Sequence, residues 1–212
     1  MSTSRTDLGA QTLTILPSTL SGRIVRLEPL ELHHADALVE AARDAEIWAY
    51  MPVRLDDPDA MRSWIETALQ ERAAGTTLAY AIVSQERDVP IGATRFMDIR
   101  ARDRGLEIGW TWLAKSAWRT GVNTEAKFLL LEHAFDAVGA IRVQFKTHRM
   151  NFRSRRAIER VGAQFEGILR NHYVLPDGTY RDSAYYSIIE SEWPAVRRHL
   201  ALSIERGGAA HR

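Results

Sequence analysis

The sequence of 212 residues contains no cysteine. This absence excludes disulfide bonds, zinc–thiolate sites and cysteine nucleophiles. The 28 basic and 27 acidic side chains nearly cancel, so net charge gives the chain no general attraction for polyanions such as nucleic acids. No apolar run approaches the length of a membrane-spanning helix, about 20 residues, and the N-terminus lacks the apolar core of a secretion signal. We therefore expect a cytoplasmic protein that binds neither nucleic acid nor membrane.

The length of the chain suits one domain with a sizeable core. We expect a loosely ordered N-terminal extension over residues 1–20, a single domain over 21–205 and a flexible tail over 206–212. His33 and His34 are adjacent at the start of an expected helix. Such a pair is typical of a solvated helix end, so no metal site is expected there.

Hydrophobic periodicity predicts an alternation of strands and helices. A meander of strands comes first, and a strand–helix–strand unit over 106–147 then indicates a crossover between parallel strands. The fold class predicted is α/β (α+β), with a mixed, mostly antiparallel sheet of about seven strands flanked by helices. The expected strands are 22–28, 78–84, 91–99, 106–113, 141–147, 165–175 and 180–189, and the expected helices are 36–43, 57–75, 121–138, 152–161 and one that begins at 191.

The loop before the helix at 121–138 has the features of an anion-binding site. First-turn amides have no partner within a helix, and the helix dipole attracts negative charge. Lys115 and Arg119 would add positive charge, and Gly121 would let a ligand approach the backbone. Neither G-x-G-x-x-G nor G-x-x-x-x-G-K-[ST] is present, which excludes the Rossmann and P-loop nucleotide sites. An ordinary loop with a glycine at the helix start would show the same residues.

Two segments together resemble a known family. EIGWTWLAKSAWRTGVNTEA, residues 107–126, and NFRSRRAIERVGA, residues 151–163, are similar to motifs of the GNAT superfamily of acyl-CoA N-acyltransferases, and within it to the RimJ/RimL-like group. The resemblance spans roughly residues 20–200. The pyrophosphate loop of the superfamily usually reads Gln/Arg-x-x-Gly-x-Gly/Ala, whereas this chain has Ser116, Arg119 and Gly121 at those positions. Only the last glycine fits, so the side-chain contacts of that loop differ here.

The resemblance implies acetyl-CoA as the acetyl donor and a place for it. Pantetheine would lie where the strands 106–113 and 141–147 separate, and a backbone N–H near Leu113 would stabilise the tetrahedral oxyanion. The expected cofactor-binding residues are Trp112, Leu113, Arg119, Thr120, Gly121, Val122, Asn123, Thr124 and Asn151.

Two side chains are the expected catalytic groups. Glu107 matches a general base of some superfamily members, and Ser154 matches a serine that protonates the leaving thiolate in RimL-like enzymes. Other assignments stay open: Glu107 as a surface carboxylate, Ser154 as a helix-start serine, His148 or His172 as the base, and Tyr186 as the acid or as a core aromatic.

The function predicted is N-acetyl transfer from acetyl-CoA to a primary amine, on a protein N-terminus or a small molecule, by direct attack. The alternative is a CoA-binding regulatory or interaction module without catalysis. A third possibility, nucleic-acid binding through Arg149, Arg153, Arg155 and Arg156, is less favoured than contacts with the 3′-phosphate of CoA. Segments 47–54 and 176–178 are expected to shape the acceptor pocket, and a homodimer is compatible with the sequence.

Overall fold

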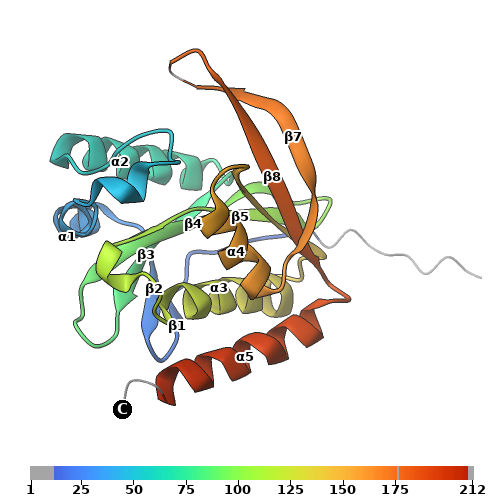
Figure 1. The fold of residues 1–212 in the computed structure, drawn as a ribbon. Helices are drawn as coiled ribbons and strands as arrows, with labels where there is room; N and C mark the ends of the chain where they lie inside the picture. The colour runs from blue at the N-terminus through green and yellow to red at the C-terminus, as the bar shows by residue number, and fades with distance from the viewer. Residues whose placement is uncertain (1–11, 176, 210–212) are drawn as a thin grey trace, which may run out of the picture.

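The computed structural model describes residues 12–175 and 177–209 and contains an eight-stranded sheet with helices on both faces (Figure 1). The sheet order is β1-β2-β3-β4-β5-β6-β8-β7, and β5 and β6 are parallel while the other neighbours are antiparallel. The strands are β1 (Leu20–Ser21), β2 (Val25–Pro29), β3 (Leu78–Ser84), β4 (Pro90–Arg100), β5 (Gly105–Leu113), β6 (Arg142–His148), β7 (Gln164–Val174) and β8 (Tyr180–Ile189).

Capping residues in the sequence set the bounds of the helices. Asp57 caps α2, because its carboxylate accepts hydrogen bonds from the amides of Asp59 and Ala60 at 3.0 Å. Gly162 ends α4 in the left-handed conformation, at φ 102°. The α-helices are α1 (Ala35–Ala41), α2 (Pro58–Ala73), α3 (Val122–Glu132), α4 (Phe152–Val161) and α5 (Trp193–Ala209). The helix expected over 121–138 is divided, because a π-helical turn over His133–Ala137 follows α3.

The helices form two layers with separate cores. On one face of the sheet, α3, α4 and α5 bury Leu130, Phe145 and Tyr186. On the other face, α1 and α2 bury Met61 and Trp112 over β3 and β4. The β7–β8 hairpin projects past both layers, away from α5 (Figure 1). In the described part of the chain, α1 and α2 therefore pack mainly on β4 and β3 of this face rather than on β6 and β8.

The structure describes part of the chain at each end of the expected domain. Residues 1–11 of the expected extension and 210–212 of the expected tail lie outside the described residues. Leu13 is buried, and its amide donates to the carbonyl of Ala101 at 3.0 Å. Part of the expected extension thus packs on the core, and α5 continues through Ala209. Within the described ranges, no helix is long and apolar enough to cross a membrane.

Candidate functional site

The parallel strands β5 and β6 pair over a short distance and then part. Their ladder joins Gly105 to Arg142, Leu106 to Val143 and Glu107 to Gln144, and in the described part of the chain no later residues of the two strands pair. We call this separation beyond Glu107 and Gln144 the fork. On the other side of β5 the ladder with β4 is irregular between Ala93 and Arg95. Trp110 lies there at φ 49°, so a β-bulge turns the carboxyl-terminal half of β5.

The backbone of Leu113 presents an N–H group on the fork side of β5. The amide of Ala114 donates to the carbonyl of Ile91 at 2.8 Å, which directs it toward the β4 side. Backbone groups alternate along a strand, so the N–H of Leu113 is directed toward β6. The carbonyl of Leu113 already accepts from Nε1 of Trp118 at 3.0 Å. The side chain of Trp112 packs on Trp48 in the core between the sheet and the α1–α2 layer.

The loop between β5 and α3, residues 114–121, leads into a helix start with free donors. Gly121 supplies no side-chain cap, while the Thr120 hydroxyl donates to the carbonyl of Ala117 at 2.7 Å and accepts from the amide of Val122 at 3.3 Å. Among the described residues, no acceptor faces the amides of Asn123 and Thr124. These two N–H groups and the helix dipole can hold an anion.

Two details of this loop concern residues that the sequence singled out there. Lys115 does not contribute a free charge, because its ammonium is 3.1 Å from the Asp44 carboxylate and 3.2 Å from that of Glu46. It fastens the loop to the segment before α2. A Cβ atom added at Gly121 would meet Cδ1 of Ile24 at 2.8 Å. A larger residue at 121 would therefore also have to displace the end of the Ile24 side chain, apart from any effect on a ligand.

The start of α4 separates the roles of two predicted residues. The Asn151 carboxamide oxygen accepts from the amide of Ser154 at 3.0 Å, so Asn151 is the cap. The hydroxyl of Ser154 makes no hydrogen bond to the residues that the structure describes. The guanidinium of Arg153 lies 3.7 Å from the ring centroid of Trp118. This cation–π contact joins the segments that follow β5 and β6.

Glu107 is a buried carboxylate at the last paired position before the fork. Its side chain is 2% exposed, so it is not the surface carboxylate that the sequence left open. Nε2 of Gln144 donates to it at 3.1 Å, and the ammonium of Lys146 is 3.4 Å away. The strand registers place further polar side chains in the same row. We call this row the polar face; its members are Glu107, Gln144, Lys146, His148, Arg181, Ser183, Tyr185 and Ser187.

Comparison with known proteins agrees with the sequence resemblance. The family model of the acetyltransferase (GNAT) domain matches residues 25–164. The chain belongs to the GNAT acetyltransferase family. It is similar to a Bacillus licheniformis protein described as uncharacterized N-acetyltransferase p20. The two sequences are 27% identical over an alignment that covers 82% of this chain and 98% of that protein. This GNAT protein is therefore an N-acetyltransferase of a family that uses acyl-CoA.

Solved structures share the fold of this GNAT protein. A GCN5-related N-acetyltransferase from Brucella melitensis matches with a TM-score of 0.87 and 28% identity, over 94% of this chain and 90% of that chain. Mycobacterium smegmatis RimJ, solved in complex with CoA-disulfide, matches with a TM-score of 0.76 and 24% identity, over 88% of this chain and 95% of that chain. The mixed, mostly antiparallel sheet predicted from the sequence is thus confirmed, and a RimJ protein shares its fold; β1, two residues long, is the additional strand.

His148, on the polar face, and His172, at its border, differ in the contacts of their ring nitrogens. Nδ1 of His148 accepts from the amide of Met150 at 3.0 Å, so the neutral ring carries its proton on Nε2 and has no free lone pair. His172 lies 3.0 Å from the Ser183 hydroxyl through Nδ1 and 3.5 Å from the Tyr185 hydroxyl through Nε2. Burial, then nearby cationic side chains, lower the pKa of both rings. At neutral pH both are uncharged, and His172 is the better alternative base.

Tyr186 is a core residue, which is one of the two assignments that the sequence left open. It is fully buried on the face that α4 covers. Its hydroxyl donates to Glu159 at 3.0 Å and accepts from Nε of Arg155 at 2.8 Å. Both contacts occupy the hydroxyl on the α4 side, so Ser154 is the better candidate for the acid.

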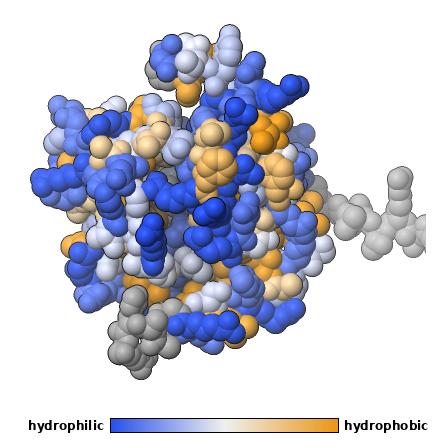
Figure 2. Space-filling model, in the orientation of Figure 1, coloured by the Kyte–Doolittle hydropathy of each residue, from blue (hydrophilic) through white to orange (hydrophobic). Residues whose placement is uncertain are grey.

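Three of the four arginines that the sequence singled out near α4 have partners, whereas Arg156 is exposed and makes no hydrogen bond or ion pair to the residues that the structure describes. Arg149 pairs with Asp182 at 3.2 Å, Arg153 covers Trp118, and Arg155 bonds Tyr186. Figure 2 shows hydrophilic residues in the middle of this view, between the α1–α2 layer and the β7–β8 hairpin, with apolar residues along the hairpin. Two surface hollows lie elsewhere, about 650 Å³ beside Asn171 and about 400 Å³ between Leu20 and Asp136.

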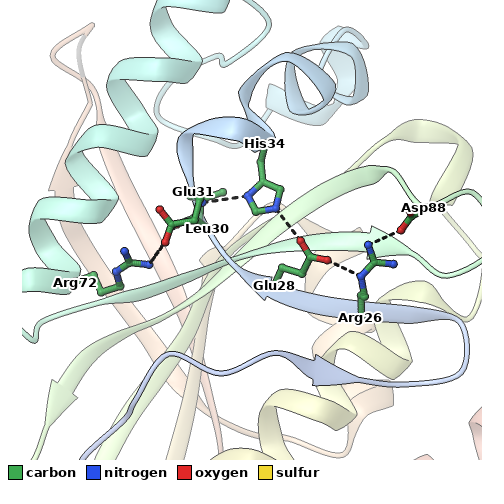
Figure 3. A network of polar contacts seen from close by, with 7 residues as sticks. All are labelled: Arg26, Glu28, Leu30, Glu31, His34, Arg72 and Asp88. Atoms are coloured by element: carbon green, nitrogen blue, oxygen red, sulfur yellow. Dashed lines mark hydrogen bonds and ion pairs between the residues drawn. The ribbon is translucent and has the colours of Figure 1, made fainter.

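The sequence predicted a solvated histidine pair near α1; His33 is exposed as expected, but His34 is not. His34 is buried, and its Nε2 lies 3.0 Å from Glu28 (Figure 3). Its Nδ1 accepts from the amide of Glu31 at 3.1 Å, so Nε2 carries the proton and donates it to Glu28. This hydrogen bond, followed by the contact with Arg26, lowers the pKa of the Glu28 carboxyl. His33, His34 and Glu28 have atoms close enough to hold a metal ion, but the protonated Nε2 has no lone pair for one.

Proposed function

We propose that this GNAT protein transfers the acetyl group of acetyl-CoA to a primary amine by direct attack. The observation that carries the proposal is the fork, because it has a buried carboxylate, Glu107, at its start and free amide donors at the start of α3 beyond it. A thioester held along β5 would reach the polar face between two strands that no longer pair. The pyrophosphate would lie at the amides of Asn123 and Thr124, where the helix dipole favours its charge.

The reaction requires three tasks of the residues around the fork. The amine nitrogen attacks the thioester carbon, and the Leu113 N–H stabilises the oxyanion. The carbon–sulfur bond then breaks, and the Ser154 hydroxyl protonates the thiolate and regains a proton from solvent. Glu107 takes the proton that the amine must lose, through a bound water. Most of the acceleration comes from holding the two reactants in line. The chain has no cysteine for a covalent acyl-enzyme.

The other function that the sequence left open, a CoA-binding module without catalysis, is disfavoured because the chain belongs to an acetyltransferase family. The loop around Ser116 and Arg119 departs from the family pattern, and Lys115 is committed to Asp44 and Glu46. A weakened phosphate site could serve binding alone. For the proposed acetyl transfer, the amine acceptor is a peptide N-terminus or a small molecule.

One experiment distinguishes the two functions. Calorimetry measures acetyl-CoA binding, and release of free thiol is followed on the same preparation with a panel of peptides and small amines. We expect binding together with amine-dependent thiol release and formation of the N-acetyl product. Binding without thiol release from any amine would identify a module. No binding would contradict both functions.

A further inference from the structure

We propose that Arg181 binds a carboxylate of the acceptor, so that the acceptor is a small molecule with an amine and a carboxylate close together, as in a free amino acid. This inference rests on the proposed function, because it assumes that an amine reaches the fork from the polar face. It goes further by naming the chemical class of the acceptor.

Arg181 has an unused hydrogen-bonding capacity. It lies in β8 opposite Tyr173 of β7, and its guanidinium carbon is 5.9 Å from the Tyr173 ring centroid. Its Nε atom is buried without a partner, and within the described ranges its guanidinium makes no hydrogen bond or ion pair. A buried donor that nothing satisfies costs free energy, so such a group is commonly explained by a ligand.

The charges around Arg181 are otherwise paired. Lys146 lies 3.4 Å from Glu107, and Arg149 lies 3.2 Å from Asp182. Each of these two pairs is neutral, and no described carboxylate lies within ion-pair distance of Arg181. Burial lowers the pKa of Arg181, and the charge of Glu107 opposes this shift only from a longer distance. One unpaired cation matches one negative charge. A carboxylate therefore fits better than a phosphate dianion, which would require a second free cation.

The chemistry of the two groups is also complementary. A guanidinium presents parallel N–H donors that match the two oxygens of a carboxylate. The rings of Tyr173 and Tyr185 border the Lys146 ammonium at 5.3 and 5.9 Å, so this part of the face is partly shielded from water. Arg181 and Glu107 belong to the same row. An acceptor whose carboxylate is on Arg181 would direct its amine along this row toward Glu107 and the fork.

The test compares acceptors that differ only in the carboxylate. Rates of thiol release are measured with L-phenylalanine, L-phenylalaninamide and 2-phenylethylamine, and with the matching leucine series, at equal concentrations of unprotonated amine. In the wild-type protein we expect kcat/KM for the better amino acid to exceed that of its amide by at least about tenfold. In Arg181→Gln this preference should disappear because kcat/KM for the amino acid falls, while kcat/KM for the amide and the amine and the affinity for acetyl-CoA stay unchanged.

Two further variants keep the test decisive. Arg170→Gln removes an exposed charge from β7 and should keep the preference, while Arg181→Lys keeps the charge, loses the paired donors and should give an intermediate preference. If wild-type protein acetylates amides or amines as well as amino acids, the inference is wrong and the proposed function stands. If acetyl-CoA binds and no acceptor of any kind releases thiol, the proposed function fails first. If Arg181→Gln does not fold, the inference is still tested by the acceptor preference of the wild-type protein and by its reduction in Arg181→Lys.

Discussion

At the scale of single residues, the buried position of Glu107 determines what it can do. A carboxylate that is 2% exposed and held by Gln144 and Lys146 has a fixed orientation at the start of the fork. An alkyl amine is mostly protonated near neutral pH and must lose a proton before it attacks. A fixed carboxylate on the same face can receive that proton directly or through one water.

Replacement of Glu107 tests this role. Glu107→Gln keeps the shape and an oxygen for Gln144 but removes the basicity, so kcat/KM at neutral pH should fall by about a hundredfold. The loss should shrink as pH rises, because more of the amine then arrives unprotonated. Steady-state kinetics across a pH series give the answer, with Glu132→Gln, which only loses an exposed pair with Arg197, as control. If the variant keeps wild-type rates at every pH, Glu107 is not the general base and His172 becomes the candidate. If the rate falls equally at every pH, Glu107 only positions the substrate.

Lys127 is a buried cation that the proposed reaction does not use. It lies on α3, and its ammonium donates to the Thr94 hydroxyl at 3.3 Å and to that of Thr111 beside the β-bulge. Burial lowers its pKa from 10.5 to about 7. In the unfolded chain its pKa is the ordinary one, so between these values the unfolded state binds more protons than the folded state. The free energy of unfolding therefore rises with pH across this window.

Lys127→Met should remove that dependence. The variant should be more stable than the wild type near pH 6, and the advantage should shrink above pH 7 by up to about 1.4 kcal/mol per pH unit. Urea unfolding at several pH values measures it. Lys115→Met is a matched control, since Asp44 and then Glu46 raise the pKa of this exposed lysine. A difference between wild type and Lys127→Met that stays constant with pH would contradict the assignment.

At the scale of elements, two strand-to-helix segments converge on the fork. One carries β5 through residues 114–121 into α3, and the other carries β6 into α4. The first turn of α3 is also attached to the segment at the start of β2. The buried Glu125 carboxylate accepts hydrogen bonds from the amides of Arg23, Ile24 and Val25 at 2.6 to 2.9 Å. The free amides of α3 are thus held in place by a contact that involves no ligand, which favours a preformed anion site.

The start of α4 allows capping and catalysis to be separated. Asn151→Ala removes the oxygen that accepts from the Ser154 amide and should lower the free energy of unfolding by about 1 kcal/mol. Ser154→Ala removes a hydroxyl without a protein partner, so it should change stability less but lower kcat with little effect on acetyl-CoA affinity. Unfolding curves and kinetics on the same preparations check both. If Ser154→Ala keeps the wild-type kcat, another group protonates the thiolate.

At the scale of the whole molecule, the sequence predicts what is local and misses what depends on distant partners. The strands 78–84 and 180–189 and the helix 152–161 are predicted with their observed bounds, because each has a clear period and a turn or cap at its ends. A two-residue strand such as β1 has no period to detect. Leu13 is buried in the core and its amide donates to the carbonyl of Ala101, far along the chain; no local sequence pattern predicts either contact.

The same limit applies to the candidate site. Glu107, Ser154 and Asn151 are found through the family motifs, which lie within short segments. Lys146 and Arg181 were not singled out, because their neighbourhood depends on β8 lying between β6 and β7. The alternation along 141–147 did place Lys146 on one face with Gln144, and that signal could have identified it. Lys115 seemed free because its partners Asp44 and Glu46 come from a different part of the chain.

The most direct test of direct acetyl transfer is an initial-rate experiment in which the concentrations of acetyl-CoA and of an accepted amine are both varied. Attack on a thioester held at the fork requires both substrates to be bound together. The account therefore predicts double-reciprocal lines that intersect, with one N-acetyl product formed for each thiol released. Parallel lines, which indicate an acetylated enzyme intermediate, or thiol release without an N-acetyl product, would contradict it.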